Sequence, residues 1–78
     1  MLKDRFLILK FGTNEELNYF IKELIENGHK RYVIELYRSI NRLGINSLER
    51  ILEKITPKYP EIEENYSSDL ADLGYSYA

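Results

Sequence analysis

Acidic and aromatic side chains alternate over the last third of the chain, where residues capable of chemistry gather. Residues 58–78 carry five Asp or Glu and one Lys, whereas residues 1–57 carry eight acids and ten Lys or Arg. Carboxylates at this density can chelate a hard cation, imitate the phosphates of a nucleic acid, or remain as solvated charge. Their spacing matches no cation-binding loop, so solvated charge explains them better than chelation.

Tyrosines between these acids favour contact with a protein. A tyrosine ring supplies rigid, amphipathic contact area at a small cost in conformational entropy. A flexible solubilising tail and a partner-binding tail explain the pattern about equally well. For a binding tail, the predicted contact residues are Glu61, Glu63, Glu64, Tyr66, Asp69, Asp72, Tyr75 and Tyr77.

A second charged group is basic and follows helical spacing. Arg31, Arg38 and Arg42 fall roughly on one helical face, with Glu35 among them. Ion pairs of Glu35 with Arg31 and Arg38 would make this an ordinary solvated face. The alternative is a strip that contacts phosphates, or one that docks the acidic segment of the same or a neighbouring chain. The residues predicted for nucleic-acid contact are Lys30, Arg31, Arg38 and Arg42.

The sequence contains no set of residues that predicts catalysis. A catalytic site needs a nucleophile, a base and an electrostatic stabiliser in one cleft. The chain has no cysteine and a single histidine, His29, which is best explained as a loop or helix-start residue. We therefore expect neither an enzyme nor a bound cofactor or metal. The longest apolar run, Phe6 to Leu9, is too short to cross a bilayer, and a cytoplasmic protein is expected.

Three amphipathic segments predict a mainly α-helical bundle of three to four short helices, at about residues 14–27, 30–43 and 47–56. In the first, Thr13 and Glu16 match a capping box and Gly28 matches a helix-ending cap. The third segment has a similar capping pattern, Asn46 with Glu49, and ends before Pro57. Each segment has an apolar stripe at helical spacing, made of Leu17, Phe20, Ile21, Leu24 and Ile25, of Val33, Leu36, Tyr37, Ile40 and Leu43 (widened by Tyr32 and Ile34), and of Leu48, Ile51, Leu52 and Ile55.

The two ends of the chain are less regular. Residues 2–11 are apolar on every side and are predicted to form a helix, with a strand as the alternative. We expect a helical body over residues 1–57 and an acidic, aromatic extension over residues 58–78. A short helix within the extension is predicted to be capped by Ser68 and ended by Gly74. A weak apolar stripe is predicted for Ile62, Tyr66, Leu70 and Leu73.

The layout of residues 6–43 resembles the ribbon-helix-helix family of DNA-binding proteins, most closely over IENGHKRYVIELYRSI. The resemblance implies an intertwined dimer, with Phe6–Phe11 as the strand and Asn14–Asn27 and Lys30–Leu43 as the two helices. The whole chain resembles the antitoxins of toxin–antitoxin pairs, which often join such a module to a C-terminal tail that wraps the toxin.

These patterns favour a small non-enzymatic regulator that binds and blocks a larger protein. A chain of this size without disulfides often relies on a partner or on self-association for stability. An antitoxin or a phage anti-defence inhibitor fits this description, acting on a partner with a basic groove, and a homodimer is compatible with it. The alternative is a dimeric, ribbon-helix-helix-like transcriptional repressor that binds DNA through the basic residues named above.

Overall fold

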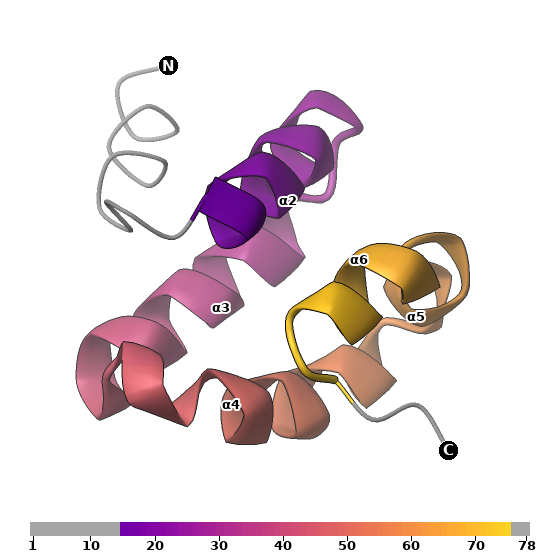
Figure 1. Ribbon diagram of the computed structural model, residues 1–78. Coiled ribbons are helices and arrows are strands. Elements are labelled where there is room, and N and C mark those ends of the chain that lie inside the picture. Colours follow the sequence, from indigo (N-terminus) through magenta and orange to yellow (C-terminus); the bar gives the residue numbers. More distant parts are fainter. Residues whose placement is uncertain (1–14, 76–78) are drawn as a thin grey trace.

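The structure is a computed structural model and describes residues 15–75. The regular structure in this part of the chain is all helical, with no strand (Figure 1). It therefore confirms the prediction of a mainly α-helical chain for these residues. In chain order the elements are α2 (Glu15–Glu26), α3 (Lys30–Leu43), a 3-10 turn (Ile45–Ser47), α4 (Leu48–Ile55), a second 3-10 turn (Thr56–Lys58), α5 (Pro60–Asn65) and α6 (Ser67–Asp72).

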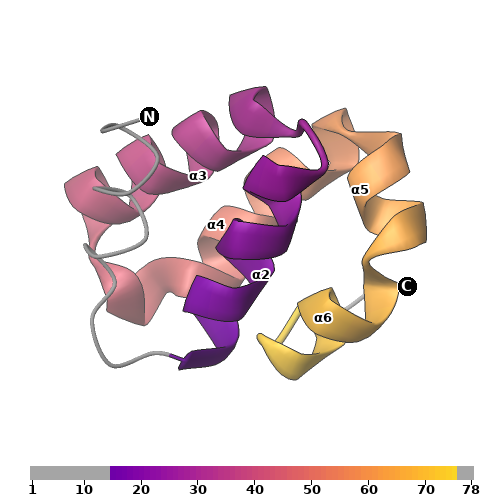
Figure 2. The same ribbon diagram turned by 90° about the horizontal axis from the view of Figure 1, so that it is seen from above.

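The helices form a bundle in which the chain returns to its first described helix. Consecutive helices α2, α3 and α4 pack in sequence, and α6 comes back to lie against α2. Seen from above, α2 runs between α3 on one side and the α5–α6 pair on the other, with α4 beneath it (Figure 2). The return of α6 to α2 brings together two segments that are far apart in the sequence.

One hydrophobic core joins all five helices. Its largest fully buried side chains include Phe20 and Tyr32, whose rings meet edge to face with centroids 6.3 Å apart. The apolar spacing of each helix explains which side chains point inward, because residues three and four apart share a helix face. The buried cluster is made of Leu17, Phe20, Ile21, Leu24, Tyr32, Val33, Leu36, Ile40, Leu48, Ile51, Leu52, Ile55, Ile62, Leu70, Leu73 and Tyr75.

The predicted boundary between a body (1–57) and a separate acidic extension (58–78) does not coincide with a break in this core. Ile62 and Leu70 are fully buried, and Leu73 and Tyr75 are nearly so. Tyr66 is partly buried and packs against the same cluster. The weak apolar stripe predicted for this segment is therefore real, and residues 60–75 are integrated into the bundle.

Glycines close the C-terminal ends of α2 and α6. Gly28 has a φ of +88°, and the amide N–H of His29 donates to the carbonyl of Leu24, which closes α2 with a Schellman-type cap. Gly74 has a φ of +96°, and the amide of Tyr75 donates to the carbonyl of Leu70 in the same arrangement. Both positions need the left-handed backbone conformation that glycine adopts without strain.

Four expectations about helix positions are wrong. Ser68 does not cap the helix of the extension, because α6 already begins at Ser67 and Tyr66 precedes it without a side-chain cap. The predicted Asn46–Glu49 capping box is absent, because residues 45–47 form a 3-10 turn and Ser47 precedes α4 without a side-chain cap. Ile34 does not widen the buried face of α3, since it is 43% exposed. Leu43, the last residue of α3, does not join the buried face either, since it is 51% exposed.

The bounds of the helices agree closely with those predicted. The helix predicted at 30–43 is α3, the one at 14–27 is described as Glu15–Glu26, and the one at 47–56 is Leu48–Ile55. The prediction of a helix or strand at residues 2–11 lies outside the described residues. Within residues 15–75, none of the helices has the length and apolar character that crossing a membrane requires.

Candidate functional site

Helices α2 and α6 bring carboxylates from distant parts of the sequence onto one surface. Asp69 on α6 lies beside Glu23 on α2, and Asp72 is one turn farther along α6. Partial burial raises the pKa of the Asp69 carboxyl, and the negative charge of Glu23, a hydrogen bond to Glu23 and the charge of Asp72 raise it further. All of these influences act in the same direction, which indicates a concentration of negative charge that nearby cations do not offset.

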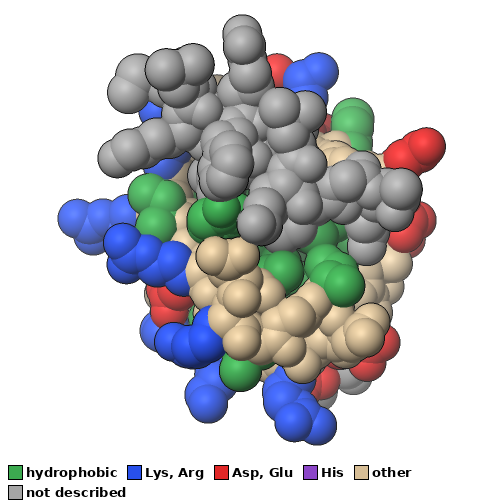
Figure 3. Space-filling view, turned by 90° about the vertical axis from the view of Figure 1, so that its left-hand side faces the viewer, with side chains coloured by type: hydrophobic (Ala, Val, Ile, Leu, Met, Phe, Trp, Pro, Cys, Tyr) green, Lys and Arg blue, Asp and Glu red, His purple; other side chains and the backbone are tan. Residues whose placement is uncertain are grey.

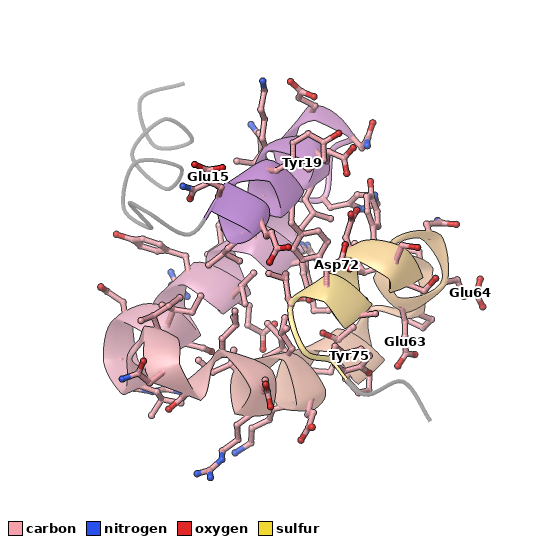
Figure 4. The ribbon with its side chains drawn as sticks, viewed as in Figure 1. Glu15, Tyr19, Glu63, Glu64, Asp72 and Tyr75 are labelled. Carbon is pink, nitrogen blue, oxygen red and sulfur yellow. The ribbon has the colours of Figure 1, made fainter. Side chains whose placement is uncertain are left out.

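An exposed tyrosine lies within this concentration of acids. Tyr19 on α2 is 60% exposed, the most exposed large apolar side chain in the described structure. Hydrogen bonding to Glu23 raises the pKa of its hydroxyl, followed by the negative charges of Glu23, Asp69 and Glu26. Figure 4 shows Tyr19 and Asp72 on neighbouring helices. We call this surface, formed by Tyr19, Glu23, Glu26, Asp69 and Asp72, the acidic face.

Only part of the predicted contact set belongs to the acidic face. Asp69 and Asp72 do, while Glu63 and Glu64 lie on α5, away from Tyr19 (Figure 4). Glu61 is exposed, also on α5. The sequence did not predict the other three members, Tyr19, Glu23 and Glu26. Their spacing of four and then three residues indicates a shared helix face, but nothing in the sequence shows that α6 packs beside them.

The predicted tyrosine anchors are mostly turned inward. Tyr75 is only 8% exposed and its hydroxyl donates to a carboxylate oxygen of Glu63 at 2.5 Å. A side chain held in this way cannot act as a protruding anchor, so that part of the prediction is corrected. Tyr66 is half-buried, with its ring edge to face against Phe20 and its hydroxyl accepting a hydrogen bond from Asn27 at 2.8 Å. Tyr77 lies outside the described residues.

The basic residues gather on a different surface. Lys30, Arg31, Arg38 and Arg42 are all exposed on α3. Figure 3 shows most of the Lys and Arg side chains along the left and lower edges of one side of the molecule, while most Asp and Glu side chains lie toward the right edge. Opposite charges are therefore largely separated over this side of the molecule.

Glu35 does not form the ion pairs predicted with Arg31 and Arg38. Its carboxylate accepts hydrogen bonds from the ammonium of Lys58 at 2.5 Å and from the hydroxyl of Tyr59 at 2.9 Å. Hydrogen bonding from Lys58, and then from Tyr59, lowers the pKa of Glu35. The prediction failed because the turn after α4 brings two better-placed donors to Glu35 than its own helix provides.

A shallow groove of about 350 Å³ runs beside this interaction. The groove is lined by Tyr59 and by four residues of α3, namely Arg31, Ile34, Glu35 and Arg38. The ring of Tyr59 is fixed edge to face against buried Tyr32, with centroids 5.2 Å apart. We call this feature the α3 groove.

His29 has a packing contact rather than a catalytic setting. It is half-buried, and its ring lies edge to face against Tyr66 with centroids 5.6 Å apart. Over residues 15–75, no three His, Cys, Asp or Glu side chains are placed to hold a metal ion together. The described carboxylates therefore do not form a metal site, although they form a charged surface.

No family model, curated protein or solved structure matches this chain. The resemblance to ribbon-helix-helix proteins and antitoxins stays a prediction. The strand that it implies, Phe6–Phe11, lies outside the described residues.

Proposed function

We propose that this protein is a small non-enzymatic regulator that binds a larger protein through its acidic face. The observation that carries the proposal is the close approach of Glu23 and Asp69 from two different helices. Two neighbouring like charges oppose folding, so a chain that keeps them side by side gains from a cationic partner. A partner with a basic groove would relieve this repulsion.

Tyr19 supports binding to a protein rather than to a small ion. Interface hot spots are enriched in tyrosine, tryptophan and arginine, and they lie within a rim of polar contacts. Tyr19 has this setting, because its exposed ring is bordered by Glu23, Glu26 and Asp69. An inhibitor of the antitoxin or phage anti-defence type would use such a surface to occupy a basic site on its target.

The experiment combines partner capture with charge reversal. The full chain is used to capture binding proteins from its source organism, and the purified partner is then titrated by calorimetry. We expect Glu23→Lys with Asp69→Lys to abolish binding, because the reversal turns attraction into repulsion. The matched control is Glu49→Lys with Glu53→Lys, an equal charge change at two exposed positions of α4 that should leave binding largely intact.

Glu61→Lys with Glu64→Lys tests the alternative set of acids predicted from the sequence. Loss of binding in this variant alone would move the contact to α5 and contradict the role of the acidic face. Equal losses of binding in all three double variants would mean that the net charge of the protein, and not the acidic face, determines binding. Circular dichroism of every variant establishes that the helical fold is kept.

A second candidate is a DNA-binding repressor, favoured by the exposure of all four predicted cations on α3. If Lys30, Arg31, Arg38 and Arg42 contact phosphates, the logarithm of the affinity for duplex DNA will fall linearly with the logarithm of the salt concentration. Anisotropy of a dye-labelled duplex measures this directly. The absence of binding at low salt would eliminate this candidate.

A further inference from the structure

The α3 groove combines positive charge with an accessible apolar side chain. Arg31, Ile34 and Arg38 follow one another along the outer side of α3, and the ring of Tyr59 faces them. Ile34 is 43% exposed and lies between the two arginines in the helix. Arg38 lies seven positions after Arg31, which corresponds to about 10 Å along the helix axis.

The two guanidinium groups have no acidic partner among residues 15–75. Glu35, the carboxylate nearest to them in the sequence of the helix, is held by Lys58 and Tyr59 instead. The one ion pair described in this part of the chain is that of Glu35 with Lys58. Lys58 and Tyr59 therefore engage the Glu35 carboxylate, which would otherwise offset the positive charge of the two arginines.

We propose that the α3 groove binds an acidic amphipathic helix of a partner protein. Two carboxylates about two turns apart on such a helix would meet Arg31 and Arg38, and an apolar side chain between them would cover Ile34. Guanidinium and carboxylate groups pair through two parallel hydrogen bonds, which fixes orientation as well as charge. A helix with apolar anchors that lies in a groove of a folded domain is a common mode of peptide recognition.

The apolar side chain distinguishes this ligand from a nucleic acid. A phosphate backbone offers no apolar group to cover Ile34. A mixed acidic and apolar helix satisfies the arginines and Ile34 together. The proposal goes beyond the function proposed for the acidic face, because it concerns another surface and a ligand of opposite charge.

The test uses the full chain and a dye-labelled helical peptide that carries Glu, Leu and Glu at the spacing of Arg31, Ile34 and Arg38. We expect saturable binding in fluorescence anisotropy that weakens with added salt. Arg31→Gln with Arg38→Gln should weaken the affinity about tenfold, and Ile34→Ser should weaken it as well. The control, Arg50→Gln with Lys54→Gln, removes the same charge from exposed positions of α4 and should leave the affinity unchanged.

Three results would overturn the proposal. The first is equal binding of a peptide with Gln in place of both Glu residues, since the arginines would then have no role. The second is an equal loss of affinity in the α4 control, which would reduce the effect to net charge. The third is tight binding of a dye-labelled DNA duplex that depends on Arg31 and Arg38 while the peptide does not bind, which would assign the surface to nucleic acid.

Discussion

The hydroxyl groups of Tyr32 and Thr56 lie 2.8 Å apart inside the core and form a hydrogen bond between α3 and the turn that follows α4. Tyr32 is 1% exposed and Thr56 is fully buried. This bond gives each hydroxyl a partner where water has no access. It also fixes the ring against which Tyr59 packs, so the same interaction supports one wall of the α3 groove.

Removing one partner of this bond should destabilise the fold more than removing both. Tyr32→Phe leaves the Thr56 hydroxyl buried without its partner, and we expect a loss of roughly 1 to 2 kcal/mol in the free energy of unfolding. Adding Thr56→Val should recover part of this loss, because no buried hydroxyl is then left without a partner. Urea denaturation of the single and double variants measures the coupling. Tyr19→Phe, on the surface, is the control, and additive losses would contradict the prediction.

The C-terminal helices should be required for the stability of the whole bundle. Leu70→Ala opens a cavity in the shared core and should cost about 2 to 5 kcal/mol. Thermal unfolding should remain one transition, at a lower temperature, because α6 and α2 belong to the same cluster. Ile34→Ala, at a half-exposed position, should change stability little. A truncation at residue 59 that kept its full helicity would contradict this prediction.

Asp69→Asn should stabilise the protein near neutral pH while weakening the proposed partner contact. The pKa of Asp69 is raised in the folded state above its ordinary value of 3.8. As the pH rises, the unfolded chain therefore loses the Asp69 proton before the folded chain does. Stability therefore falls as the pH rises through the folded-state pKa, and the amide removes that loss. We expect the difference between the two proteins to vanish below the ordinary pKa. An Asp69→Asn variant less stable at neutral pH would mean that the repulsion by Glu23 is unimportant.

Glu35→Gln should make folding less sensitive to acid. The pKa of Glu35 is lowered in the folded state, so its contribution is present above the ordinary value of 4.5 and is lost as the pH falls toward the folded value. Because Lys58 is exposed and solvent screens the pair, the loss of stability at neutral pH should be small. Urea midpoints measured from neutral to acidic pH provide the test. An unchanged acid dependence would show that the Lys58 and Tyr59 contacts do not persist in solution.

Gly28→Ala and Gly74→Ala should have similar costs, of about 1 to 2 kcal/mol, because both force alanine into a left-handed conformation. A Cβ at residue 28 meets open space, whereas one at residue 74 falls 2.7 Å from Oε2 of Glu49. Since Glu49 is exposed, its side chain should swing aside at little cost. If Gly74→Ala is much more costly and Glu49→Ala restores stability, Glu49 is held in place more firmly than its exposure suggests.

The sequence predicts the helices well because each has a complete local signal. The spacing of Leu17, Phe20, Ile21 and Leu24 identifies the buried side of α2, and Gly28 marks its end. Ile34 could also have been placed correctly. It is two residues from Leu36 and therefore roughly 200° around the helix from the centre of the buried face.

The candidate site depends on a contact that local signals do not encode. The pairing of Glu23 with Asp69 requires α6 to pack against α2, and the sequence patterns of the two helices do not specify each other. The same holds for Glu35, whose partners come from the turn after α4. The inward position of Tyr75 follows from the cap at Gly74, which redirects the chain toward the core. Charge patterns along one helix therefore predicted the wrong partners.

The return of α6 to α2 has a consequence for how the protein forms during synthesis. Leu17, Phe20, Ile21 and Leu24 emerge from the ribosome early, but Leu70, Leu73 and Tyr75, which share their core, emerge among the last described residues. The nascent chain thus exposes part of the apolar surface of α2 until α6 has been synthesised, and that surface is open to chaperones or to premature association. Cooperative closure of the bundle is therefore a late event that follows the release of nearly the whole described chain.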